Sequence, residues 1–374
     1  MERFIRYAGG IIGTLRALYR QIINRYFGKI ERFDGNARQI GEQIIDRVWQ
    51  GEFYRTSLGH YDFFWMRDFG TVANSLTHLG HKDKVQRTLN WALMNYMKSN
   101  HVTQCIDRHG NAFNAPAKKS VDALPWLLHS LVVSNYRLRP IERRFLNERL
   151  AHYTDVYLTP EGDLKQGVHF AELRDAVNYD RSAYAIALIG RMSVCAKELD
   201  LHFGFTVDTY QSILKEHYWN GKFFKADRVT NVYSSESALM PFFHDIIDDK
   251  KMVNATMDYI AKRKLNKPYP LQYGEHSEKF RFRPTMNNTI MPEYTGTTLW
   301  TWHATFYLHV LKRYDRHDYD ENYHKFAELI ERHGTYPELV NHDGSWYKAP
   351  FYMADPGMIW IALFLELEPP KPIR

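Results

Sequence analysis

Two segments that lie far apart in the 374-residue sequence carry carboxylic acids suited to proton transfer. In the first, Glu172 and Asp175 flank Arg174, and in the second, Glu338 stands in a loop between aromatic residues. General acid–base catalysis uses two such groups, one protonated and one ionised. Taken one at a time, each segment is more simply interpreted as exposed surface charge. Their position in the fold therefore decides between the two interpretations.

A third segment places charged side chains next to aromatic rings. Arg67 and Asp68 follow Trp65, and Tyr61 precedes them. An arginine and an aspartate beside an indole suit the binding of a sugar, because charged groups grip neighbouring hydroxyls while the ring stacks on the apolar face. In the alternative interpretation, Asp68 caps a helix and pairs with Arg67.

Two further segments also open expected helices. Asp122 and Trp126 belong to a stretch that begins at Ser120, and Tyr294 and Trp300 bracket another. Helix capping alone would explain Ser120 and Asp122. Each motif is weak by itself, so their joint placement carries the argument.

The elements that must position these residues are helices. The sequence predicts twelve of them, over residues 36–50, 68–80, 82–98, 120–137, 141–154, 180–199, 205–218, 235–247, 250–264, 296–313, 319–333 and 355–367. The connections before the even-numbered helices are long or carry the motifs above, whereas those after them are short. This alternation predicts an all-α fold, an (α/α)6 toroid of six helical hairpins. Its even helices would line the inside, with their N-termini on one rim, where positive helix ends favour carboxylates.

The chain divides into an N-terminal segment, residues 1–35, and the toroid, residues 36–374. The segment is basic and amphipathic, with seven Lys or Arg against two Glu in residues 1–32. We expect a helix there that packs on the domain; interfacial contact with a membrane through residues 3–32 and disorder are the alternatives. Without this segment the net charge of +6 falls close to neutrality, so a nucleic-acid partner is not expected.

The composition restricts the class of protein and its cellular location. Aromatic residues make up 15% of the chain, which fits either a large helical core or a cleft lined for sugar rings. Cys105 and Cys195 are too few for a disulfide framework or a cysteine-based zinc site, so we expect a cytoplasmic protein. The sequence contains no run of about 18 uncharged apolar residues, so it predicts no membrane-spanning helix.

In their order along the chain, these motifs resemble those of the (α/α)6-barrel glycoside hydrolases, especially glucoamylases, glycogen-debranching glucosidases and neutral invertases. Trp65-Met66-Arg67-Asp68-Phe69 resembles the Trp-x-Arg-Asp of glucoamylases and the Arg-Asp-Phe of invertases. Ser120-Val121-Asp122-Ala123 with Trp126 resembles a stretch of the debranching glucosidases.

The other three motifs extend the resemblance over about residues 36–367. Arg174-Asp175-Ala176 lies where these families place the general acid, ahead of the sixth helix. The element from Tyr294 to Trp300 is similar to their Tyr-His-Asn-Gly-x-x-Trp, although it lacks the His-Asn pair. Tyr336-Pro337-Glu338 resembles the Trp-Pro-Glu that carries the base in invertases.

The resemblance implies an inverting, exo-acting glycoside hydrolase of α-glucosides or related oligosaccharides. Asp175 would be the acid and Glu338 the base, with Glu172 in a supporting role; glucoamylases use a glutamate as the acid, so Glu172 competes with Asp175. The implied sugar-binding residues are Tyr61, Trp65, Arg67, Asp68, Asp122, Trp126, Arg174, Tyr294 and Trp300. No metal or organic cofactor is implied.

Three other functions remain open at this stage. The chain could be a catalytically inactive carbohydrate-binding protein that retains the barrel, or an invertase-like or trehalase-like hydrolase of a disaccharide. A lyase on the same toroid is the third. Assays on gluco-oligosaccharides and sucrose, with product analysis, distinguish them.

Overall fold

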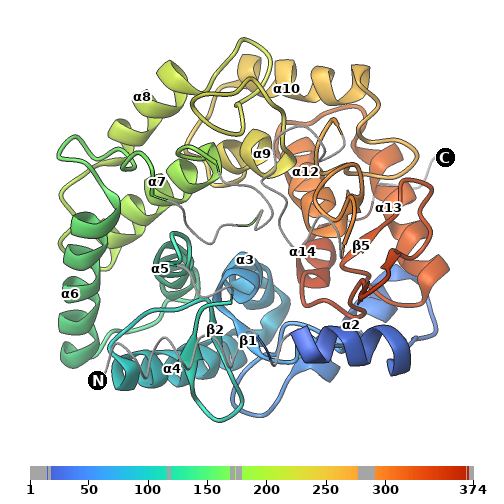
Figure 1. The fold of residues 1–374 in the computed structure, drawn as a ribbon, viewed down its shortest axis with the longest axis horizontal. Helices are drawn as coiled ribbons and strands as arrows, with labels where there is room; N and C mark the ends of the chain where they lie inside the picture. The colour runs from blue at the N-terminus through green and yellow to red at the C-terminus, as the bar shows by residue number, and fades with distance from the viewer. Residues whose placement is uncertain are drawn as a thin grey trace.

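Twelve helices of the described chain alternate between an inner and an outer ring, and the chain travels once around both (Figure 1). The computed structural model describes residues 15, 18–115, 119–168, 173, 179–276, 291–367 and 369. The inner helices are α3 (Met66–Leu76), α5 (Ala123–Val133), α7 (Ala183–Glu198), α9 (Ser235–Phe243), α12 (Thr301–Arg313) and α14 (Ile361–Glu366). The outer helices are α2 (Ala37–Val48), α4 (Lys82–Ser99), α6 (Pro140–Tyr157), α8 (Val207–His217), α10 (Lys250–Lys262) and α13 (Tyr319–His333).

The inner ring is closed by direct packing between successive helices. Each inner helix contacts the next, and α14 returns to contact α3. Ten of the thirteen residues of α12 are buried, against six of the eighteen residues of outer helix α4. Inner helices are covered on all sides and are therefore apolar all round, whereas outer helices need only one apolar stripe.

Capping side chains stabilise the N-terminal ends of several of these helices. Asn36 caps α2, and its side chain accepts hydrogen bonds from the backbone N–H groups of Arg38 and Gln39, while Gln39 bonds back to the Asn36 N–H. The side chains of Ser182 and Asp249 cap α7 and α10 by accepting hydrogen bonds from backbone N–H groups of the first turn. These caps satisfy N–H groups that have no partner inside a helix.

Short strands connect the loops on the rim where the inner helices begin. β1 (Phe64–Trp65), β2 (Cys105–Ile106) and β3 (Ala112–Phe113) form an antiparallel sheet, in which Trp65 pairs with Cys105. β4 (Leu299–Trp300) pairs with β5 (Leu339–Val340), and β6 (Lys348–Ala349) pairs with β7 (Tyr352–Met353). Because β1 and β4 lead directly into α3 and α12, these strands tie the motif loops to the helix ends.

The predicted all-α toroid is confirmed, and each expected helix has a counterpart. The largest differences are at the rim. Residues 296–300 are not helical, and α12 begins at Thr301; residues 355–360 precede α14 instead of forming its first turns. These stretches make hydrogen bonds across the rim, which hold their backbone out of the helix.

The N-terminal segment is helical over residues 18–27. No helix among the described residues is both long and apolar enough to cross a membrane. The division of the chain at residue 35 remains a prediction.

Because α3 packs closely against α5, adding one methyl group at their contact should destabilise the protein. A Cβ atom on Gly70 would lie 2.6 Å from the Cβ of Trp126. Gly70→Ala should therefore lower the free energy of unfolding by about 1–3 kcal/mol, although alanine is the better helix former. Urea unfolding measures this change.

Gly204→Ala is the matched control, because nothing lies within 4 Å of the added atom. It should leave the free energy of unfolding almost unchanged. Equal effects of the two substitutions would contradict the close approach of α3 and α5.

Candidate active site

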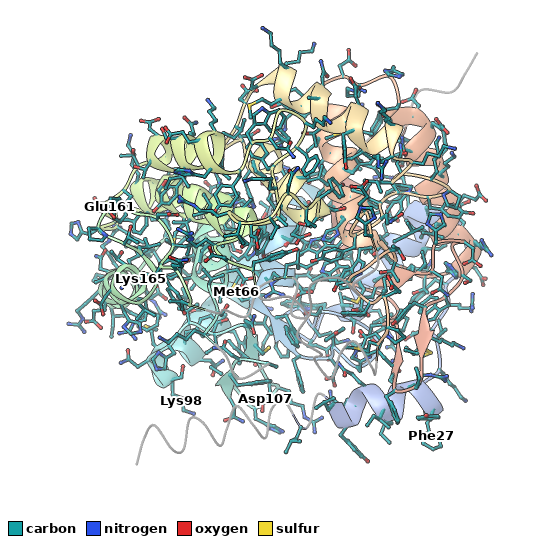
Figure 2. The ribbon with its side chains drawn as sticks, turned by 45° about the horizontal axis from the view of Figure 1, so that its top comes forward. Phe27, Met66, Lys98, Asp107, Glu161 and Lys165 are labelled. Carbon is teal, nitrogen blue, oxygen red and sulfur yellow. The ribbon has the colours of Figure 1, made fainter. Side chains whose placement is uncertain are left out.

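The predicted site residues that the structure describes gather at the N-terminal ends of the inner helices. Arg67 and Asp68 lie in the first turn of α3, and Asp122 directly precedes α5. Glu338 directly precedes β5, which pairs with β4 at the start of α12. Met66, the first residue of α3, lies toward the middle of the molecule (Figure 2). Glu172, Arg174 and Asp175 lie outside the described residues.

The carboxylate of Glu338 is buried and receives hydrogen bonds on both oxygens. The hydroxyl of Tyr352 lies 2.8 Å from Oε1 and 2.6 Å from Oε2, and the hydroxyl of Tyr294 donates to Oε1. The backbone N–H of Asp355 donates to Oε2 at 3.0 Å. Glu338 is only 1% exposed, so these donors replace the water that a surface carboxylate would bind.

Tyrosine hydroxyls continue this network away from the carboxylate. The Tyr61 hydroxyl lies 3.1 Å from that of Tyr352 and 3.3 Å from that of Tyr294. Burial and the nearby charge of Glu338 raise the pKa of all three tyrosines well above its usual value, so they stay protonated and serve as donors. The three rings thus surround Glu338 with neutral, hydrogen-bonding groups.

Asp355 is a second buried carboxylate directly behind Glu338. Its oxygens accept hydrogen bonds from the Ser57 hydroxyl and from the backbone N–H groups of His60 (2.8 Å) and Tyr61 (2.9 Å). His60 Nδ1 lies 2.8 Å from Asp355 Oδ1. A Cβ on Gly59 would lie 1.9 Å from Oδ1, so the loop can approach this closely only because it has a glycine here.

The two neighbouring carboxylates have opposite pKa shifts. Burial raises the pKa of Glu338, although the charge of His60 and the tyrosine hydrogen bonds oppose it. At Asp355 burial acts in the same direction, but the charge of His60 and hydrogen bonds from His60 and Ser57 outweigh it and lower the pKa. Asp355 is therefore a fixed anion, whereas Glu338 can take up a proton more readily, as acid–base catalysis requires.

Arg67 and Asp122 form a buried ion pair between the starts of α3 and α5. Arg67 Nε lies 2.5 Å from Asp122 Oδ2, and their side chains are 8% and 0% exposed. Tyr184 donates to the same Asp122 oxygen at 3.1 Å, and Ser120 donates to the other at 2.8 Å. The indole N–H of Trp126 donates to the Tyr184 hydroxyl. Trp126 is fully buried, so in this structure it supports Tyr184 from the core.

Asp68 lies next to this pair and is also buried. Its Oδ1 accepts a hydrogen bond of 3.0 Å from the indole N–H of Trp360. Burial raises its pKa to about 7, against the opposing effects of Arg67 and the Trp360 bond. A carboxyl group with such a pKa can donate or accept hydrogen bonds near neutrality.

Two tryptophans, Trp300 and Trp65, also lie at the rim and contact different tyrosines of the site. Trp300 is 4% exposed, and its N–H donates to the Tyr294 carbonyl, which fixes Tyr294 beside Glu338. Trp65 is half-buried and meets the edge of Tyr61, with ring centroids 5.4 Å apart. Its indole N–H has no hydrogen-bond partner among the described residues. The Trp65 N–H is therefore a buried donor that no described residue satisfies.

Six residues that hold the carboxylates of this site were not among the predicted site residues: Ser57, His60, Tyr184, Tyr352, Asp355 and Trp360. Tyr352 and Asp355 stand shortly before the last inner helix, much as Arg67 and Asp68 stand at the start of the first, and this similarity was the available signal. Among the described residues, no group of three His, Cys, Asp or Glu side chains could hold a metal ion.

Comparison with solved structures finds the same architecture in glycosidases. A glycosidase solved as several single-residue variants superposes with a TM-score of 0.66 at 12% identity, over 88% of this chain and 94% of the other. Another of its variants, with a glutamate replaced by alanine, was solved with glucose and gives a TM-score of 0.65. The chain shares the fold of these glycosidases.

A second relative by structure is the GH63 mannosylglycerate hydrolase from Thermus thermophilus, solved with Tris and D-glycerate. It has a TM-score of 0.58 and 12% identity, over 88% of this chain and 99% of the other. No family model and no curated protein matches the sequence. At these identities the comparison establishes the fold, and the site geometry must carry the function.

The raised pKa of Asp68 predicts a pH-dependent stability. Between the unfolded value near 4 and the folded value of about 7, the folded protein binds the extra proton, so its stability falls as pH rises through this window. Asp68→Asn removes this proton and should abolish a slope of about 1.4 kcal/mol per pH unit. Urea unfolding at several values from pH 4.5 to 7.5 measures both slopes.

Asp46→Asn controls for the loss of one carboxylate, since the Asp46 side chain is 74% exposed. It should keep the wild-type slope. If wild type and Asp68→Asn show parallel stability curves over the window, Asp68 titrates normally and its buried role is wrong.

Proposed function

We propose that this protein is an inverting glycoside hydrolase, exo-acting on α-glucosides or related oligosaccharides, with Glu338 as the general base. The observation that carries the proposal is the Glu338 carboxylate, buried at the N-terminal ends of the inner helices and held by Tyr294, Tyr352 and the Asp355 N–H. Such an arrangement orients the carboxylate and tunes its proton affinity.

The reaction requires the transfer of two protons. A water molecule attacks the anomeric carbon and gives its proton to Glu338, while the acid donates a proton to the glycosidic oxygen as the bond to the leaving group breaks. The products are a free sugar with inverted configuration and the released alcohol. The two carboxyl groups should lie about 6.5–9.5 Å apart, which leaves room for the water.

Asp175 is the proposed acid, and Glu172 is its competitor. The segment that contains them leads into α7, which begins at Ala183 and belongs to the same inner ring as α12 beside Glu338. The N-terminal ends of both helices lie on one rim. This supports a site in which the two carboxyl groups face a common substrate.

The remaining rim residues are proposed to bind the terminal sugar. Trp65 carries a buried N–H that no described residue satisfies, and the Arg67–Asp122 pair offers charged groups fixed by burial. Asp68 lies beside them. The full set that the resemblance implies is Tyr61, Trp65, Arg67, Asp68, Asp122, Trp126, Arg174, Tyr294 and Trp300; in it Trp126, which is fully buried, acts through its hydrogen bond to Tyr184.

The choice of a glucoside rests on the resemblance of the motifs and on the glucose held by one structural relative. The mannosylglycerate hydrolase shows that a small glycoside can also be the substrate on this fold. A disaccharide or a hexosylglycerate therefore belongs in the substrate panel beside gluco-oligosaccharides and sucrose. Cys105 and Cys195 are buried and not joined by a disulfide, which is compatible with the proposed cytoplasmic location.

The catalytic pair predicts which carboxylates are essential. Glu338→Gln and Asp175→Asn should each lower turnover by about 10²–10⁴-fold, because each removes one proton-transfer group and keeps its shape. Glu172→Gln should be milder. Sugar release from the active member of the panel measures the effect, and proton NMR of the fresh product should show inversion.

Glu216→Gln, at an exposed position on α8, is the control and should keep full activity. If Glu172→Gln is inactive and Asp175→Asn is active, the general acid is Glu172 instead of Asp175. Full activity of both Glu338→Gln and Asp175→Asn would refute the proposed site. A wild-type protein that binds the sugars without releasing product would be a carbohydrate-binding protein instead.

The hydrogen bonds from Tyr352 predict a shift in the pH profile. The hydroxyl stabilises the ionised form of Glu338, so Tyr352→Phe should raise the pKa of Glu338 further and move the acidic limb of kcat/KM to higher pH. At pH values below this limb, kcat/KM should fall by about 10–100-fold, the effect of one hydrogen bond to a charged group.

Tyr314→Phe is a matched control, since Tyr314 also donates to a carboxylate, Asp248, at 2.9 Å. It stands at the other end of α12, about 20 Å from Thr301. Its pH profile should coincide with that of wild type. An unshifted limb in Tyr352→Phe would mean that Glu338 does not control the acidic side of the profile.

A further inference from the structure

The N-terminal helix, residues 18–27, packs on the domain through polar side chains. Arg20 forms an ion pair with Asp62 and lies over the ring of Phe63. Asn24 donates to Asp355 Oδ1 at 3.2 Å, and Arg25 donates to the Ala349 carbonyl at 2.7 Å. A helix on a soluble protein normally turns its apolar stripe to the core, so this orientation is the reverse of the usual one.

The outward face of this helix is apolar. Of the ten large hydrophobic side chains that are exposed in the described chain, six belong to residues 15–27. They include Phe27 at 77% exposure and Tyr19 at 66%, together with Leu15, Ile22, Ile23 and Tyr26. Phe27 lies at the periphery of the molecule (Figure 2). Single exposed hydrophobic residues are ordinary, but this concentration marks an interaction surface.

The turn between β6 and β7 extends this surface. The hydroxyl of Tyr26 donates to the carbonyl of Pro350 at 2.8 Å, which brings the helix to the turn. Phe351, at the tip of the turn, is 48% exposed. Lys29 and Lys348 are exposed beside these apolar residues. We call the set Leu15, Tyr19, Ile22, Ile23, Tyr26, Phe27 and Phe351 the apolar face.

The chemistry of this face selects one kind of partner. Isoleucine, phenylalanine and tyrosine with flanking cations are the composition of helices that lie in a membrane interface. The stretch of residues 1–32 has five more basic than acidic side chains, which anionic lipids attract. A second copy of the chain would bring the same positive charges together, which disfavours self-association through this face.

We propose that the apolar face docks this protein on the surface of an anionic bilayer. The helix lies in the plane of the interface, its apolar side chains enter the headgroup region, and Lys29 and Lys348 meet lipid phosphates. This inference is independent of the proposed catalytic activity. It replaces the broader expectation of membrane contact through residues 3–32 with a surface made of named, exposed side chains.

Docking would place the candidate active site close to the lipid surface. Phe351 at the tip of the turn is followed directly by Tyr352, which points inward to Glu338. Asn24 on the inner side of the helix reaches Asp355, which bonds to Glu338. The N-terminal helix and the β6–β7 turn therefore carry the apolar face on their outer side and contact the buried carboxylates on their inner side.

Vesicle binding of the full chain tests this proposal. Wild-type protein should float with vesicles of phosphatidylcholine and phosphatidylglycerol, bind weakly to phosphatidylcholine alone, and lose binding as salt is added. The triple variant Tyr19→Ser, Ile22→Ser and Phe27→Ser should bind the anionic vesicles at least about tenfold more weakly, because the apolar area that enters the interface is lost.

A matched triple variant, Met94→Ser, Ile141→Ser and Val229→Ser, removes exposed hydrophobic residues of similar exposure elsewhere and should bind as wild type does. Circular dichroism establishes that both variants are folded. Absence of wild-type binding to anionic vesicles, or equal losses in the two variants, would overturn the proposal. So would a wild-type dimer that the first variant dissociates and that binds no vesicles.

Discussion

The burial of the Glu338 carboxylate is the constraint on which the candidate site depends. An ionised carboxylate loses its hydration when it enters the protein, so the protein must supply donors in fixed positions. Here the donors come from two segments: Tyr294 lies before β4, and the Tyr352 hydroxyl and the Asp355 N–H both belong to the segment from β7 towards α14. Only a fold that brings both segments to the rim where Glu338 lies can keep the carboxylate charged when it is required.

The closed inner ring provides this rim. Each inner helix begins where a long loop ends, so helix packing deep in the ring sets the positions of the loops above it. The close approach at Gly70 and the buried Arg67–Asp122 pair connect α3 to α5, and the β4–β5 pairing connects α12 to Glu338. Asp355 and His60 add a second layer, in which a fixed anion and its partner lie behind the carboxylate that must change its charge.

Much of this arrangement could be predicted from the sequence, because helix periodicity and the alternation of long and short connections are local patterns. Arg67, Asp68, Asp122 and Glu338 could be placed together because the first three lie at the starts of two expected inner helices and Glu338 lies in the loop upstream of a third. His60 and Asp355 could not be paired in advance, since they are 295 positions apart and interact partly through backbone N–H groups, which have no sequence signature. The non-helical stretch before α14 was missed for the same reason.

The inverted N-terminal helix illustrates a further limit of patterns. Its amphipathic spacing was visible, but spacing alone does not say which face meets the domain. Arg20, Asn24 and Arg25 find polar partners on the rim, and these contacts turn the apolar face outward.

The central claim is that Glu338 is the base of a hydrolytic site, and a crystal structure of Glu338→Gln with an intact glucoside tests it most directly. The account predicts that the anomeric carbon lies within reach of one water molecule from the residue 338 side chain. A second carboxyl group, from Asp175 or Glu172, should lie about 6.5–9.5 Å from that side chain, on the opposite side of the glycosidic bond. A sugar bound away from residue 338, or one with no second carboxyl group near its glycosidic oxygen, would contradict the account.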